Sequence, residues 1–121
     1  MRILTTPSFD RDLRGSGLDN DALKMAVREI EAGLIDANLG SELLKKRIAR
    51  PGSGKSGGYR TVLAYRQGER VIFMHLFAKN EKSDVTRSEL TALKTLAKTY
   101  MSLSAEELEK AVLKLALREV K

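Results

Sequence analysis

Two apolar runs in the second half of the chain constrain the fold more than any other feature. Residues 58–66 and 70–79 are rich in β-branched and aromatic side chains, and Gln67-Gly68-Glu69 separates them. Such runs on either side of a glycine-containing turn predict a β-hairpin. The other elements must therefore pack on an antiparallel pair of strands.

The length of the hairpin turn decides which side chains share a face of the sheet. A two-residue turn pairs even-numbered residues of the first strand with odd-numbered residues of the second, and a three-residue turn reverses this parity. With a two-residue turn, one face carries Arg60, Val62, Ala64, Phe73, His75, Phe77 and Lys79. The more apolar face, which we expect to be the core beneath the helices, carries Tyr59, Thr61, Leu63, Tyr65, Ile72, Met74 and Leu76.

A glycine-rich segment, Gly-Ser-Gly-Lys-Ser-Gly-Gly-Tyr-Arg at residues 52–60, leads into the first hairpin strand. Its Gly-Lys-Ser resembles the end of a nucleotide-binding P-loop. That motif needs a further glycine where this chain has Ala49, and a helix directly after the loop. Because a strand follows instead, the pattern excludes an ATP site. It predicts a cationic loop that delivers Tyr59 and Arg60 onto the sheet.

Two helices are predicted between an edge strand at residues 2–5 and the middle of the chain. Thr6 before Pro7 is typical of a helix N-cap with proline in the first turn, and Gly15 or Gly17 ends this helix. The second helix begins near Asp19 and stops at Gly33. Its apolar residues recur at helical spacing: Leu23, Ala26, Val27, Ile30 and Leu34. The pair forms a helical hairpin on one face of the sheet.

A charged strand at residues 43–50 and two C-terminal helices complete the expected elements. Thr86-Arg-Ser-Glu89 and Ser104-Ala-Glu-Glu107 both have capping-box spacing ahead of apolar residues. The second box opens an additional C-terminal helix, expected to run to Val120. The order β-α-α-β-β-β-α-α predicts an α+β fold in one domain, residues 1–121, with a small antiparallel sheet that has a mixed edge.

Charge is concentrated in the middle of the chain. The 121 residues carry a net charge of +6, with no cysteine and no apolar run long enough for a membrane span, so we expect a cytoplasmic protein. Between residues 45 and 82, only Glu69 and Glu81 oppose ten basic residues: Lys45, Lys46, Arg47, Arg50, Lys55, Arg60, Arg66, Arg70, Lys79 and Lys82. This favours polyanion binding, nucleic acid first, with a solvated basic face as the alternative.

The same region offers cations and hydroxyls for chemistry rather than a metal site. A lone histidine and scattered carboxylates supply no metal-ligand spacing, and no G-x-S-x-G nucleophile motif is present. Such a set suits metal-independent RNA cleavage, in which the substrate's own 2′-hydroxyl attacks the phosphate and arginine or lysine stabilises the transition state. Arg60 is the strongest candidate. His75 serves proton transfer or is a strand histidine, Lys55 is catalytic or only touches phosphate, and Tyr59 belongs to the core.

Several segments together resemble one protein family. They are Leu-Gly at 39–40, Lys-Lys-Arg at 45–47, Gly-Lys-Ser-Gly-Gly-Tyr-Arg at 54–60, and Phe-Ala-Lys-Asn-Glu at 77–81. With the opening Phe-Asp-Arg at 9–11, they resemble the RelE/HigB-like toxins of bacterial type II toxin–antitoxin modules. The resemblance implies an α+β fold with an N-terminal helical hairpin. It also implies a ribosome-dependent mRNA endonuclease that needs no cofactor and is blocked by an antitoxin of the helix-turn-helix type.

The resemblance also implies roles for individual residues. The family's strand arginine falls on Arg60, the preceding basic residues on Arg50 and Lys55, and the cation after the hairpin on Lys79. The expected catalytic residues are Arg60, Lys55, Lys79 and His75, and the expected RNA contacts are Lys45, Lys46, Arg47, Arg50, Ser56, Asn80 and Lys82. The family's C-terminal tyrosine has no counterpart, and Tyr100 lies too far along a helix to replace it. A ParE-like gyrase inhibitor and a degenerate nucleic-acid-binding protein are the alternatives.

Overall fold

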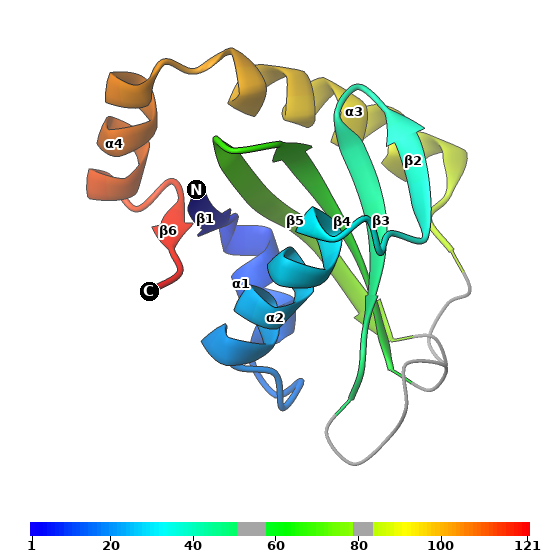
Figure 1. The fold of residues 1–121 in the computed structure, drawn as a ribbon. Helices are drawn as coiled ribbons and strands as arrows, with labels where there is room; N and C mark the ends of the chain where they lie inside the picture. The colour runs from blue at the N-terminus through cyan, green and yellow to red at the C-terminus, as the bar shows by residue number, and fades with distance from the viewer. Residues whose placement is uncertain (51–57, 79–83) are drawn as a thin grey trace.

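A computed structural model describes residues 1–50, 58–78 and 84–121 of the chain (Figure 1). Within these ranges it shows a mixed six-stranded sheet and four helices. The elements are β1 (Arg2–Thr5), α1 (Pro7–Leu13), α2 (Asn20–Glu31), β2 (Ala37–Gly40), β3 (Leu43–Ile48), β4 (Tyr59–Arg66), β5 (Arg70–Ala78), α3 (Arg87–Ser102), α4 (Ala105–Leu113) and β6 (Arg118–Glu119). The α+β class expected from the sequence is confirmed.

The sheet has the strand order β2-β3-β4-β5-β1-β6. β1 runs parallel to β5, and the other neighbouring pairs are antiparallel. The prediction that residues 2–5 form an edge strand is wrong, because β6 pairs with the outer side of β1. β2 and β6 were not predicted. Each has four residues or fewer, which is too short for a strand pattern to be recognised.

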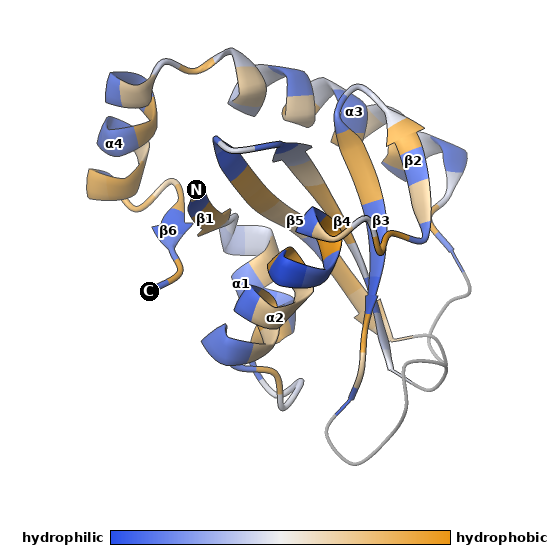
Figure 2. Ribbon diagram, in the orientation of Figure 1, coloured by the Kyte–Doolittle hydropathy of each residue, from blue (hydrophilic) through white to orange (hydrophobic). Residues whose placement is uncertain are grey.

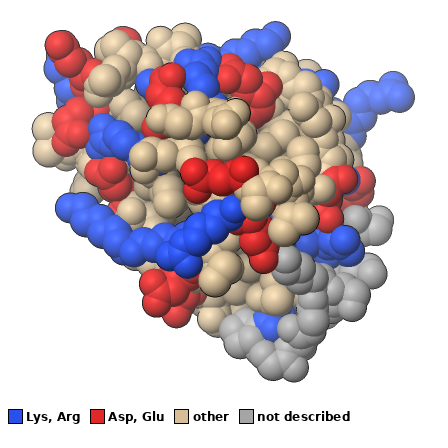
Figure 3. Space-filling view, viewed as in Figure 1, with Lys and Arg blue, Asp and Glu red and all other residues tan. Residues whose placement is uncertain are grey.

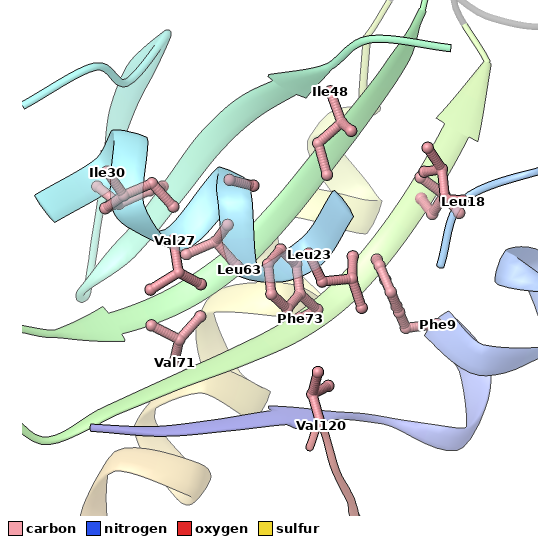
Figure 4. Close-up of a cluster of buried hydrophobic side chains, with 13 residues drawn as sticks. Phe9, Leu18, Leu23, Val27, Ile30, Ile48, Leu63, Val71, Phe73 and Val120 are labelled. Atoms are coloured by element: carbon pink, nitrogen blue, oxygen red, sulfur yellow. The ribbon is translucent and has the colours of Figure 1, made fainter. Parts of the chain in front are cut away.

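Helices cover both faces of the sheet (Figure 1). α1 and α2 pack on one face around a core that includes Phe9, Leu23, Val27, Leu63 and Phe73 (Figure 4). α3 and α4 pack on the other face, around a second core that includes Leu4, Val62, Ile72, Met101 and Leu108. α1 and α2 thus cover the face that carries Leu63 and Leu76, whereas Ile72 and Met74, which were predicted beneath them, pack on the α3–α4 side. The opposite face is also apolar over much of its area, which the sequence pattern did not show.

The hairpin has one of the two possible pairing parities near its turn and the other parity farther along the strands. The turn has three residues, because Arg66 pairs with Arg70 and Leu63 with Phe73. A β-bulge then shifts the register, so that Val62 pairs with His75. Phe73 consequently packs on the α1–α2 side, and its predicted place beside Arg60 is wrong. Beyond the bulge the extra residue restores the predicted parity.

The N-cap residues next to each helix determine where the helices begin. The Thr6 and Asp19 side chains accept hydrogen bonds from Phe9 N and Ala22 N. The two predicted capping boxes, at Thr86 and Ser104, are both formed. α2 ends at Glu31, so Leu34 lies beyond the helix and is 57 % exposed rather than on its buried face.

The C-terminal helix is shorter than predicted. α4 ends at Leu113, and Leu115 adopts a left-handed backbone with φ 61° that turns the chain back. Leu117 and Val120 are then buried, and Val120 N donates to Ile3 O at 2.8 Å. The predicted helix to Val120 is wrong because burial of these two side chains favours a return strand. Within the described ranges, no helix has the length and apolar character needed to span a membrane.

Candidate functional site

The register of the three central strands gathers polar side chains on the face that carries α3. Arg47 of β3 lies opposite Arg60 of β4, and Val62 lies between Lys45 of β3 and His75 of β5. Directly opposite residues in a sheet project to the same side. We call Lys45, Arg60 and His75 the basic sheet face. Along β3, hydrophobic residues give way to hydrophilic ones where the strand contributes Lys45 to this face (Figure 2).

Arg60 is partly buried, and one of its donors has no partner among residues 1–50, 58–78 and 84–121. Its Nη1 atom is inaccessible to solvent and makes no hydrogen bond within the described part of the chain. A buried donor left unpaired costs roughly 1–3 kcal/mol. A phosphate oxygen would satisfy the Nη1 donor once the atoms that cover it move aside, since guanidinium groups bind phosphate with charge-assisted hydrogen bonds.

Gly58 sets the close approach of strands next to Arg60. It is buried, and a Cβ atom placed on it would lie 2.3 Å from Ile48 O and 2.9 Å from Arg50 N. Only a residue without a side chain allows this approach. The last glycine of the glycine-rich segment is therefore required where β4 begins, two residues before Arg60.

Two carboxylates from the start of α3 face the basic residues. Lys45 Nζ lies 2.8 Å from Asp84 Oδ2, and His75 Nε2 lies 3.7 Å from Glu89 Oε2. The His75 ring also contacts the Phe77 ring, with 5.4 Å between centroids. The face is therefore a mixed acid–base surface rather than a purely cationic one.

Three of the predicted RNA contacts have other partners. Lys46 lies on the opposite face, where its side chain is 4 % exposed and Nζ is 2.8 Å from Glu29 Oε1. This ion pair holds Lys46 against α2, and its predicted contact with RNA stays a prediction. Arg47 Nε lies 2.7 Å from Asp36 Oδ1. The Arg50 guanidinium lies over the Tyr59 ring, 4.9 Å from its centroid.

Tyr59 and Tyr100 both lie in packed surroundings. The Tyr59 hydroxyl donates to Ser16 O at 2.7 Å, and its ring packs against the core beneath α1 and α2, as predicted. Tyr100 packs in the second core, where burial raises the pKa of its hydroxyl. Neither ring lies on the basic sheet face.

Five of the predicted site residues lie outside the described ranges: Lys55, Ser56, Lys79, Asn80 and Lys82. Their roles stay predictions. The residues that flank these segments are described, and they lie at one end of the sheet, because Tyr59 pairs with Ala78. Arg60 is one residue from that end.

The sequence reasoning did not find the carboxylates of the site, Asp84 and Glu89. The Thr86–Glu89 capping box was visible in the sequence, but its contact with His75 joins residues from different elements. In the part of the chain that the structure covers, no three His, Asp or Glu side chains are grouped so as to hold a metal ion. On the face that carries α1 and α2, positive and negative side chains are interspersed (Figure 3).

Comparison with known proteins identifies the family. The sequence model of the family described as the RelE toxin of the RelE/RelB toxin–antitoxin system matches residues 1–120. A search of curated proteins found no match. The family match agrees with the fold and spans every element that builds the basic sheet face. The chain is a member of the RelE toxin family, and thus a toxin of a toxin–antitoxin module whose partner is an antitoxin.

Proposed function

We propose that this toxin is an endoribonuclease that cleaves mRNA on the ribosome, in the cytoplasm and without a metal ion. The observation that carries the proposal is the buried Nη1 donor of Arg60 on the basic sheet face, which has no hydrogen-bond partner among the described residues. Family membership supports the same activity, because RNA cleavage is the general activity of RelE toxins. The proposed antitoxin is of the helix-turn-helix type, encoded in the neighbouring reading frame.

The reaction needs a nucleophile, proton transfer and charge stabilisation. The 2′-hydroxyl attacks the adjacent phosphorus, and the bond to the 5′-oxygen breaks to leave a 2′,3′-cyclic phosphate and a 5′-hydroxyl. Arg60 would stabilise the negative charge that builds on the phosphoryl oxygens. His75, on the same face, would accept the proton of the 2′-hydroxyl, and solvent would supply the proton that the leaving 5′-oxygen takes up. Lys55 and Lys79 remain the proposed additional cations.

Fewer residues contact RNA in this proposal than in the sequence prediction. Lys45 would contact the phosphate backbone after leaving Asp84, since both are at the protein surface. Arg47 would bind at the sheet edge, where its side chain is 44 % exposed. Lys46 has no part in it, because its ion pair with Glu29 is buried.

Induced expression in bacteria, with mRNA ends mapped by primer extension, tests the proposal. Replacing Arg60 with alanine should lower the cleavage rate about 10²–10³-fold, which is the usual loss when one transition-state donor is removed. Arg28→Ala is the matched control. Arg28 is an exposed arginine on α2, on the opposite face of the sheet, and its loss should leave cleavage unchanged.

Two results would overturn the proposal. Equal mRNA cleavage by Arg60→Ala and the parent chain would remove Arg60 from the reaction. Growth arrest with DNA damage and without mRNA cleavage would favour the gyrase-inhibitor alternative.

A further inference from the structure

Glu89 makes two contacts that no local sequence rule connects. Its Oε1 accepts a hydrogen bond from Thr86 N at 2.8 Å, and its backbone N donates to Thr86 Oγ1 at 3.1 Å, which completes the capping box of α3. Its Oε2 lies 3.7 Å from His75 Nε2. One carboxylate thus joins the start of α3 to the histidine of the basic sheet face.

We propose that Glu89 is a positioning residue that orients His75 and sets its protonation for proton transfer. This rests on the proposed function in one respect, that His75 moves the proton of the 2′-hydroxyl. A carboxylate beside Nε2 favours the tautomer with its proton on Nε2. The basic lone pair is then on Nδ1, which becomes the nitrogen that accepts a proton from substrate.

The burial of the ring atoms supports this assignment. Nε2 is inaccessible to solvent, whereas the His75 side chain as a whole is 22 % exposed. Nε2 is therefore buried, on the side of the ring that lies toward Glu89. The Phe77 ring beside the imidazole further limits its rotation, since the two rings are in contact.

The capping box gives Glu89 its fixed geometry. The Thr86 N–H holds Oε1, so the second oxygen points in one direction from the first turn of α3. A free surface glutamate would lose side-chain entropy on orienting a histidine. Here the capping box has already restricted the Glu89 side chain, so that orienting His75 costs little further entropy.

Charges from two strands, from α3 and from the residues just before α3 surround His75, and they act in opposite directions. Lys45 on β3 and Arg60 on β4 disfavour the imidazolium, while Glu89 and Asp84 at the start of α3 favour it. The Glu89 carboxylate lies 3.7 Å from the ring nitrogen Nε2. Removal of its charge should therefore lower the pH at which His75 titrates.

The chain offers a direct measurement, because His75 is its only histidine. An NMR titration of the imidazole Cε1–H signal in the purified toxin needs no assignment and no RNA. Glu89→Gln removes the charge but keeps a residue type that forms capping boxes. We expect the titration midpoint to fall by about 0.5–1 pH unit, as the loss of one nearby opposite charge predicts.

The second capping box supplies the matched control. Glu107 occupies the same position in α4 and bonds to Ser104 in the same way, but belongs to a different helix. Glu107→Gln should leave the midpoint unchanged. Glu89→Asp keeps the charge and should give a midpoint between those of the parent chain and Glu89→Gln. An equal midpoint in the parent chain, E89Q and E107Q would overturn the proposal.

Cleavage assays separate this proposal from the proposed function. In E89Q, the acidic limb of the pH–rate profile should move by the same amount as the NMR midpoint, and His75→Ala should abolish that limb. A shifted midpoint in a chain that cleaves no RNA would refute the endoribonuclease and leave the positioning of His75 intact. Cleavage with a profile that does not move in E89Q would refute the role of Glu89 in proton transfer.

Discussion

At the scale of single residues, two lysines that are adjacent in the sequence have different environments. Lys45 is at the surface beside Asp84, whereas Lys46 is buried beside Glu29, because neighbouring residues of a strand project to opposite faces. The sequence pattern grouped both as RNA contacts. Composition shows that a segment is basic, but only the register of the sheet shows which basic side chains can reach a ligand.

Lys46→Ala should therefore reduce stability rather than RNA binding. Removing one partner of a buried ion pair costs about 3–5 kcal/mol, and the 23 % exposure of the Glu29 side chain should bring this to about 2 kcal/mol. Urea denaturation measures the change. Lys45→Ala is the control, with a loss below about 1 kcal/mol for an exposed pair. Equal losses in the two variants would contradict the assignment.

Gly58→Ala should destabilise the fold by about 1–3 kcal/mol, which is the usual cost of overpacking. The added Cβ would meet Ile48 O at 2.3 Å, so that the start of β4 must move away from β3. Gly15→Ala is the comparison. It has positive φ but nothing within 4 Å, and so suffers backbone strain without collision. A smaller loss for Gly58→Ala than for Gly15→Ala would show that the strands accommodate the methyl group.

At the scale of elements, the helix starts were predictable, and so were the ends of α1 and α2, where Gly15 and Gly33 follow the C-caps with positive φ. The ends of α3 and α4 were not. All four N-caps are residues next to the helix they begin, so the sequence displays them. The end of α3 depends on Arg66 and Arg70 from the β4–β5 hairpin, which donate to the carbonyls of Tyr100, Met101 and Leu103. These arginines are about 30 residues away in sequence, beyond the reach of local rules.

Arg70→Ala should loosen the attachment of α3 to the sheet. The Arg70 side chain is 5 % exposed, and its loss leaves two carbonyls at the end of α3 without these donors. We expect a loss of about 2–4 kcal/mol, measured as a lower midpoint in thermal unfolding. Arg66→Ala, at a more exposed position with a single such bond, should cost less. The reverse order would argue against this role of Arg70.

The site residues on the strands were predictable from the sequence, and those contributed by α3 and the residues before it were not. The position of Arg60 and His75 on one face followed from strand alternation, although a three-residue turn and a bulge produced it rather than a two-residue turn. Glu89 and Asp84 were hidden because contacts between α3 and the sheet depend on tertiary packing. The glycine-rich motif indicated the family, and the match over residues 1–120 confirms it.

At the scale of the whole molecule, stability should fall in acid. Hydrogen bonds lower the pKa of Glu42 through Arg66, of Glu107 through Ser104, and of Glu119 through Arg2. A carboxyl with a lower pKa in the folded state stabilises the fold above its unfolded pKa, about 4.3, and this stability is lost as pH falls through the folded value. Urea midpoints measured at pH 7, 5 and 3 should therefore drop mainly between pH 5 and 3. Glu119→Gln should reduce that drop, and an unchanged drop would exclude the Arg2–Glu119 pair as a contributor.

The pairing of β1 with β6 has a consequence for the synthesis of the toxin. Arg2 and Glu119 are joined by two hydrogen bonds across 117 residues of sequence, and the two ends of the chain lie side by side (Figure 1). A nascent chain cannot cover the outer edge of β1 until residue 119 has left the ribosome. Completion of this sheet therefore waits until residue 119 has emerged, although β1 itself is made first.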